Sequence, residues 1–113
     1  MIHILIPTTP ERRYRIAKCA EHIRANAGLP HIISTYENVG EGYIKAIHKM
    51  LENLKDDTMV LCFADDLKMS EPDTLKRMQE RFDESFPDRD GVLNANDGFQ
   101  KGRLITQPYC KRS

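Results

Sequence analysis

Residues 58–66 read TMVLCFADD, and this segment decides which fold class the chain can adopt. Residues 59–63 follow one another without a charged side chain. A strand that is apolar on both faces is typical of the centre of a parallel sheet that helices cover on each side. The run ends in two adjacent carboxylates, Asp65 and Asp66. We therefore predict a buried central strand that delivers two acids to one edge of a sheet.

Other strand and helix patterns alternate along the chain around this segment. β-Branched residues predict strands at 2–6 and 31–37, a short apolar run predicts a strand within 91–97, and residues 103–107 are a candidate fifth strand. The first of these strands is expected to stop at Pro7. A first helix is predicted to begin at Pro10 with Thr9 as its N-cap, and to end at Gly28.

Two further helices are predicted from apolar periodicity. An apolar stripe at helical spacing marks a second helix that closes near residues 55–57; its members are Ile44, Ile47, Leu51 and Leu54. A capping box of Ser70 and Asp73 marks the start of a third helix that ends before Pro87. The residues that this third helix is expected to bury are Leu75, Met78 and Phe82.

The alternation of strands and helices predicts an α/β fold, a Rossmann-like three-layer sandwich with a mainly parallel sheet. The 113 residues fit one domain, residues 1–113. Seventeen basic and seventeen acidic side chains cancel, so the chain lacks the electrostatic signature of a nucleic-acid-binding protein. Three cysteines without CxxC spacing favour a reducing, cytoplasmic location. No apolar run approaches the ~20 residues of a membrane helix.

The loops that follow the first three predicted strands are expected to meet, because ligands of such sheets bind outside the carboxyl ends of the strands. In the first loop, Thr8 and Thr9 offer hydroxyl groups, and Arg12 and Arg13 offer guanidinium groups. Together with a helix N-terminus these groups suit a diphosphate. The alternative is that Thr9 only caps the helix and that both arginines are solvated.

The second and third loops carry glycines and acids. Gly40 and Gly42 allow the backbone either to approach a ligand or simply to turn from strand to helix. Asp65 and Asp66 repel each other unless a cation or a donor compensates their charge, and Mg²⁺ or Mn²⁺ would suit their oxygen ligands. The alternative is that they form only a polar strand end. Nearby tyrosines either stack on a base or cover the seam between helix and sheet; they are Tyr14, Tyr36 and Tyr43.

Taken together, residues 3–23, 36–51, 56–82 and 87–98 resemble the nucleotide-sugar-binding half of a family 2 glycosyltransferase of the GT-A fold. The resemblance covers nearly the whole chain. In that family the first strand ends in proline and threonine followed by arginine, a glycine-containing segment precedes the second helix, and a later strand delivers a DXD-type acidic motif. These features fall on Pro7, Thr8 and Arg12, on Asn38, Gly40 and Gly42, and on Asp65 and Asp66.

The resemblance implies that the acidic motif holds Mn²⁺ or Mg²⁺, which bridges the diphosphate of a nucleotide-diphospho-sugar such as a UDP-sugar. Asp66 matches the last, metal-binding acid of the motif, and Asp65 matches its middle position. The chain departs from a strict DXD motif because Ala64 stands where the first acid would contact the ribose.

The function that follows from the resemblance is transfer of a sugar to an unknown acceptor. Asp97 is the acid placed where an acceptor-side base would lie, although a turn at residues 96–98 is the alternative role. A catalytically inactive nucleotide-binding or assembly module is the alternative function, and a purely structural domain is a third. The chain reads as a truncated or minimal GT-A-like unit. A homodimer is expected because such a sheet leaves an edge exposed, and a monomer in gel filtration at high concentration would contradict it.

Overall fold

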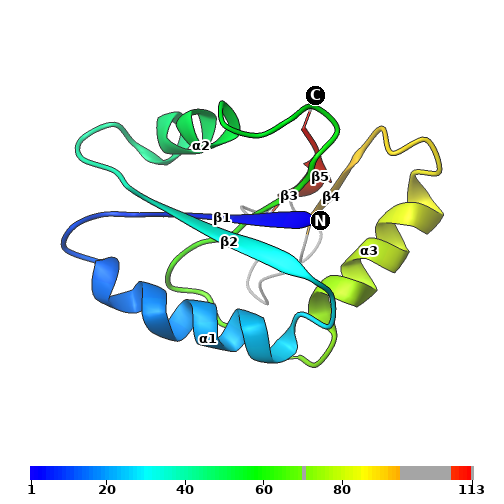
Figure 1. The fold of residues 1–113 in the computed structure, drawn as a ribbon, viewed down its shortest axis with the longest axis horizontal. Coiled ribbons are helices and arrows are strands. Elements are labelled where there is room, and N and C mark those ends of the chain that lie inside the picture. Colours follow the sequence, from blue (N-terminus) through cyan, green and yellow to red (C-terminus); the bar gives the residue numbers. More distant parts are fainter. Residues whose placement is uncertain (70, 95–107, 113) are drawn as a thin grey trace.

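The computed structural model describes residues 1–69, 71–94 and 108–112. Its elements are β1 (Ile2–Thr8), the 3-10 helix η1 (Arg13–Arg15), α1 (Ile16–Asn26), β2 (His31–Glu37), α2 (Tyr43–Leu51), β3 (Met59–Cys62), α3 (Thr74–Ser85), β4 (Val92–Asn94) and β5 (Pro108–Lys111). The strands form one five-stranded sheet in the order β2-β1-β3-β5-β4 (Figure 1). Strands β2, β1 and β3 are parallel, and β5 runs antiparallel to both of its neighbours. The predicted α/β class is confirmed, with a mixed sheet whose central part is parallel.

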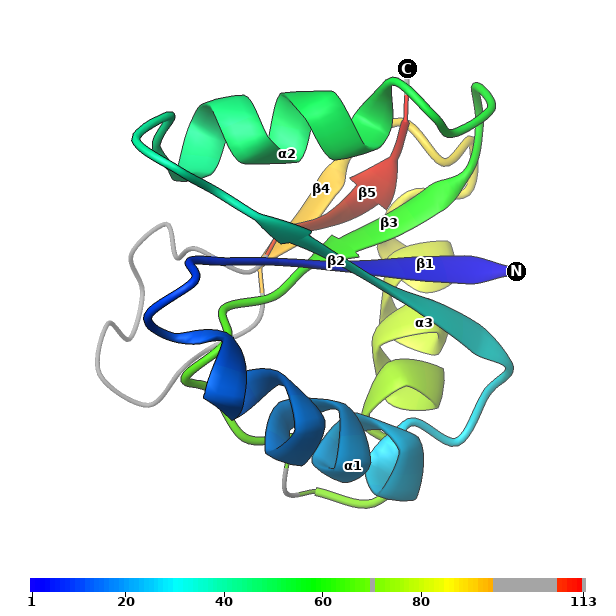
Figure 2. The same ribbon diagram turned by 60° about the vertical axis from the view of Figure 1, so that its left-hand side comes forward.

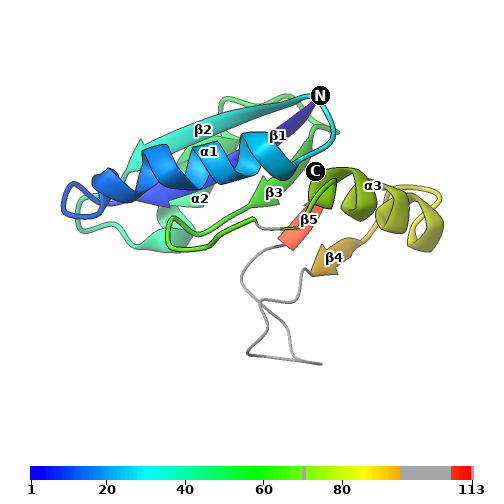
Figure 3. The ribbon, with the colours of Figure 1, turned by 90° about the horizontal axis from the view of Figure 1, so that it is seen from below.

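The helices lie on both faces of the sheet, with α2 on one face and α1 and α3 on the other (Figure 2). A view from below shows α1 over β1 and β2, and α3 at the end of the sheet formed by β5 and β4 (Figure 3). The larger apolar cluster joins the sheet to α1 and α3, and the smaller one joins it to α2. No helix in the described ranges is long and apolar enough to cross a membrane.

Strand β3 occupies the middle of the sheet, as its apolar sequence predicts. Its side chains alternate between the two clusters: Leu61 packs in the larger cluster and Val60 in the smaller one. On the next strand, Tyr109 is fully buried and meets the ring of Phe82 edge-on, with 5.6 Å between the ring centroids. Burial of β3 on both faces explains why residues 59–63 do not alternate between polar and apolar side chains. The predicted strand at 103–107 lies outside the described residues.

Strand β1 continues through Pro7 to Thr8, whereas the sequence predicts a stop at Pro7. The pairing of β1 with β3 ends at Leu5, whose carbonyl accepts a hydrogen bond of 2.9 Å from the N–H of Phe63. Pro7 lies two residues further on and faces the same side, where no partner strand remains. Its missing N–H therefore costs no ladder bond, as at a sheet edge.

The predicted start of the first helix at Pro10 is wrong. The N–H of Arg12 donates to the carbonyl of Thr9 at 3.0 Å in a turn, η1 follows, and α1 begins only at Ile16 without a side-chain cap. The turn places the guanidinium of Arg12 2.5 Å from Asp65, a contact between segments 53 residues apart. Because this contact is tertiary, a local capping pattern does not reveal it.

The predicted start of the third helix also differs from the structure. Helix α3 begins at Thr74, and Asp73 at its N-cap has a left-handed backbone with φ 56° and no side-chain cap bond. Ser70 lies outside the described residues. Asp73 packs against Gly28, where an added Cβ would lie 2.9 Å from the Asp73 Cα, so the contact between the end of α1 and the start of α3 requires glycine. The predicted burial of Leu75 and Phe82 is confirmed, and Met78 is half-buried.

Helix α2 packs on the sheet with most of the predicted stripe, since Ile47, Leu51 and Leu54 contact the smaller apolar cluster, but Ile44 does not. Ala46 and Met50 are buried, Ile47 is half-buried, and Ile44 is 67% exposed. Ile44 precedes Ala46 by two residues and so lies on the far side of the helix, since residues two apart do not share a face. The prediction for Ile44 is therefore wrong.

Substitutions on α2 provide a matched test of this packing. We expect Met50→Ala to lower the free energy of unfolding by about 2 to 5 kcal/mol, because it opens a cavity in the smaller apolar cluster. Ile44→Ala should change it by less than about 0.5 kcal/mol. Urea denaturation of both variants measures the difference, and equal losses would contradict the observed orientation of the helix.

Candidate functional site

The order of the strands reverses between β1 and β3. The chain leaves β1 through α1 to reach β2 on one side, and then returns through α2 to β3 on the other side. In open α/β sheets, ligands bind at such a switch point, outside the carboxyl ends of the strands. A crevice of about 390 Å³ lies at this place, and we call it the β1–β3 crevice. Its lining residues are Pro7, Thr8, Thr9, Arg12, Asn38, Tyr43, Ala64, Asp65 and Asp66.

Asp65 is held at the base of the β1–β3 crevice by two donors. The hydroxyl of Thr8 donates to its Oδ2 at 2.7 Å, and Nη2 of Arg12 donates to its Oδ1 at 2.5 Å. The residue is only 6% exposed. A carboxylate that is buried to this extent requires a charged partner and hydrogen bonds to offset its loss of water. Thr8 and Arg12 meet that requirement from the loop after β1.

Asp66 differs from its neighbour in exposure. Its side chain is 53% exposed, and its Oδ2 lies 3.6 Å from the same Nη2 of Arg12. Arg12 therefore forms ion pairs with both adjacent carboxylates and offsets one of their two negative charges. The Nε of Arg12 is buried and has no acceptor in the part of the chain that the structure describes. The crevice thus presents an accessible carboxylate beside a guanidinium side chain that is 43% exposed.

The loop after β2 reaches the crevice through Asn38. The N–H of Asn38 donates to the carbonyl of Thr8 at 2.7 Å, which extends the pairing of β1 with β2. Its side-chain Oδ1 accepts the N–H groups of Glu41 at 2.8 Å and Gly42 at 3.1 Å. Gly40 and Gly42 have φ of 72° and 88°, in the left-handed region that favours glycine. These glycines shape the turn, and neither is among the residues that line the crevice.

A polar triad fixes this loop to α2. The Tyr36 hydroxyl donates to Glu41 at 2.7 Å, and Lys49 forms an ion pair with the same carboxylate. The hydrogen bond from Lys49, and then that from Tyr36, lowers the pKa of Glu41. Tyr36 also packs against the smaller apolar cluster, so it covers the seam between helix and sheet. The triad therefore positions the start of α2 beside the crevice.

Tyr43, the first residue of α2, lines the β1–β3 crevice. It is 36% exposed, and burial, with a smaller contribution from Cys62, raises its pKa to about 12. The phenol is therefore neutral and able to donate a hydrogen bond at physiological pH. The resemblance does not assign this residue, which the sequence offered only as one of three tyrosines that either stack on a base or cover the seam between helix and sheet.

The structure brings together some of the predicted site residues and separates others. Pro7, Thr8, Thr9, Arg12, Asn38, Asp65 and Asp66 share the crevice. Arg13 instead lies 3.5 Å from Glu37, where both side chains are largely exposed. Asp97, the predicted base, lies outside the described residues.

A divalent cation would find few free ligands from the protein in this crevice. Both oxygens of Asp65 already accept hydrogen bonds, and no group of three or more His, Cys, Asp or Glu side chains suited to a metal occurs among the described residues. Asp66 offers a free carboxylate of the right chemical class. Mg²⁺ is often held by only one or two carboxylates, with phosphate oxygens and water as its other ligands. The residues therefore fit a metal ion that arrives together with a phosphate-bearing ligand.

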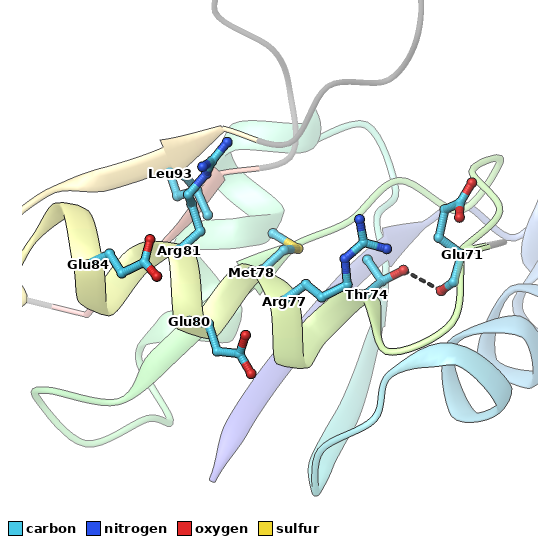
Figure 4. Close-up of a pocket in the computed structure, with 8 residues that line it drawn as sticks. All are labelled: Glu71, Thr74, Arg77, Met78, Glu80, Arg81, Glu84 and Leu93. Atoms are coloured by element: carbon cyan, nitrogen blue, oxygen red, sulfur yellow. Dashed lines mark hydrogen bonds between the residues drawn. The ribbon is translucent and has the colours of Figure 1, made fainter.

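A larger groove of about 700 Å³ lies along α3 and next to β4 (Figure 4). Its charged side chains alternate in sign and are all exposed; they are Glu71, Arg77, Glu80, Arg81 and Glu84. Four of these five come from one helix, which is typical of a solvated helix face. The groove has no buried polar network comparable to that of Asp65 among the described residues. The smaller crevice is therefore the better candidate site.

Comparison of the chain with protein-family models, with curated proteins and with solved structures found no match.

The two acids differ enough in burial for stability measurements to separate them. We expect Asp65→Asn to lower the free energy of unfolding by about 1 to 3 kcal/mol, because an amide leaves either Thr8 or Arg12 without an acceptor. Asp66→Asn should change it by less than about 0.5 kcal/mol. Chemical denaturation at constant ionic strength tests both variants. An Asp65→Asn protein as stable as the parent would show that the buried network contributes nothing.

Proposed function

We propose that this chain is a GT-A-like domain that binds a nucleotide-diphospho-sugar in the β1–β3 crevice and serves in glycosyl transfer to an acceptor. The observation that carries the proposal is the arrangement of Arg12, which buried Asp65 holds beside exposed Asp66 at the switch point of the sheet. A guanidinium and a carboxylate side by side suit a metal-bound diphosphate, because the guanidinium binds the phosphate oxygens and the carboxylate binds the metal ion.

Each residue of the crevice has a role in this proposal. Arg12 binds the diphosphate and stabilises the negative charge that develops on it as the leaving group. The hydroxyl of Thr9 and the phenol of Tyr43 lie on the same lining and supply hydrogen-bond donors. Asn38 keeps the loop after β2 against β1, so that the nucleoside end of the ligand meets a fixed wall.

Asp66 would hold Mn²⁺ or Mg²⁺ together with oxygens of the diphosphate. When bound, the ion would supply charge neutralisation on the leaving nucleoside diphosphate. Asp65, the other acid that the resemblance assigns to metal and nucleotide binding, acts in this proposal through Arg12, because its own oxygens are occupied.

The relation to a Rossmann-like GT-A sandwich belongs to the same proposal. The parallel order β2-β1-β3 and the placement of helices on both faces support it. A UDP-sugar is the proposed donor class.

A nucleotide-binding module without catalysis is the second candidate function. In the described part of the crevice, Asp66 is the carboxylate that remains exposed, and the metal would occupy it. The described residues therefore provide groups that would bind the sugar-nucleotide donor, but no further exposed carboxylate in the crevice that would deprotonate an acceptor. Binding without release or transfer of the sugar would favour this candidate.

The proposal is tested by thermal unfolding with UDP or UDP-glucose, in the presence and absence of MnCl₂. A ligand that binds only the folded state stabilises it, by about 2.7 kcal/mol at one hundred times its dissociation constant. We expect the melting temperature to rise when metal and nucleotide are both present. The variant Asp66→Asn should lose the part of this rise in melting temperature that depends on metal.

Asp90→Asn is the matched control, because Asp90 is also an exposed aspartate but does not line the crevice. It should respond to metal and nucleotide as the parent does. If the parent protein shows no shift with any of the nucleotides at millimolar concentration, the proposed function fails.

A further inference from the structure

A second cleft, of about 310 Å³, lies on the other side of the segment that follows β3, between that segment and α1. We call it the α1 cleft. The segment is fixed to α1 at two points: the Cys19 thiol lies 3.8 Å from the carbonyl of Ala64, and the side-chain amide of Asn26 donates to the carbonyl of Met69 at 2.7 Å. Figures 1 and 2 show this segment running beside α1. The cleft therefore has two walls that are held together.

Basic side chains lie on both walls of the α1 cleft. Arg15, Lys18 and His22 come from the helical wall, at spacings of three and four residues that place them along one side of the helix. Lys68 comes from the opposite wall. The chain as a whole has no net charge, so this concentration of basic groups is local.

None of these four basic side chains forms an ion pair within the described ranges, in contrast to Arg12, Lys49 and Arg112. Arg15 donates to the Tyr14 hydroxyl at 3.2 Å, which holds the guanidinium beside the ring without satisfying its charge. The two acids that border the cleft, Asp65 and Asp66, both lie within 4 Å of Arg12, which offsets one of their two negative charges. Arg15, Lys18 and Lys68 carry three positive charges, so the cleft keeps a net positive charge. The arginine and lysine side chains of the α1 cleft are therefore available to a ligand.

The geometry points to a binding site for the phosphate group of a small phosphomonoester in the α1 cleft, separate from the sugar-nucleotide site proposed above. A phosphate dianion has several acceptor oxygens, so it can receive hydrogen bonds from both walls at once. Tyr14 is 72% exposed at the same cleft and offers a flat face to a sugar ring carried by that phosphate.

The floor of the cleft favours binding over covalent chemistry. Cys19 is almost fully buried, and burial followed by the charges of Asp65 and Asp66 raises its pKa to about 11. Its thiol is therefore protonated at physiological pH and a poor nucleophile. Half-buried Leu67 adds an apolar side chain to the lining of the cleft.

Titration calorimetry of the full chain tests the site with inorganic phosphate, glucose 6-phosphate and glucose, at constant ionic strength and without metal or nucleotide. We expect both phosphates to bind, glucose 6-phosphate to bind more tightly than inorganic phosphate, and glucose not to bind. Lys18→Gln and Lys68→Gln should each weaken binding by about tenfold, because each removes one charge-assisted hydrogen bond. Both lysines are exposed, so circular dichroism should show an unchanged fold.

Lys45→Gln on α2 is the matched control, since Lys45 is equally exposed but lies outside the cleft, and it should bind phosphate as the parent does. The proposal is overturned if the parent protein binds neither phosphate. It is also overturned if Arg12→Gln abolishes binding while both lysine variants retain it, because the phosphate would then occupy the β1–β3 crevice. Phosphate binding that persists in a protein without metal-dependent UDP binding would refute only the function proposed for the crevice.

Discussion

The carboxylate of Asp65 is the constraint on which the rest of the site depends. It is almost fully buried where β3 leaves β1, and a charge in that position destabilises the fold unless donors surround it. Thr8 at the end of β1 and Arg12 in the following turn supply those donors. This requirement fixes the turn at residues 9–12, delays the start of α1, and leaves Asp66 as the acid that faces solvent.

The sequence was sufficient to predict the class of fold and the central position of β3, because burial on both faces leaves a direct pattern in the chain. It also predicted which loops meet, since the carboxyl ends of parallel strands share one edge of a sheet. The antiparallel insertion of β5 between β3 and β4 was not predicted. Alternation of strands and helices specifies which elements exist, but it does not fix the order of the last strands.

The predictions that were wrong concern local details that tertiary contacts determine. Thr9 and Pro10 have the local features of a helix start, yet the pairing of Arg12 with Asp65 favours a turn there. Asp73 was expected inside a capping box, but its close approach to Gly28 places it in a left-handed conformation before α3. Within the site, the sequence grouped Arg13 with Arg12, and only the structure shows that their side chains diverge toward Glu37 and Asp65.

The adjacent acids form a wall that the β1–β3 crevice and the α1 cleft share. Each cavity also contains one arginine from the short turn at residues 12–15. Arg12, which binds Asp65, lines the β1–β3 crevice, and Arg15, which lies beside Tyr14, lines the α1 cleft. A change at Asp65 or Asp66 therefore alters the charge of both cavities at once. Tyr43 lines only the β1–β3 crevice and Lys18 lines only the α1 cleft, so a substitution at either residue changes one cavity alone. The paired acids thus lie between the two cavities. Because both acids pair with Arg12, the basic groups of the α1 cleft form no ion pair within the described residues and remain free for anions.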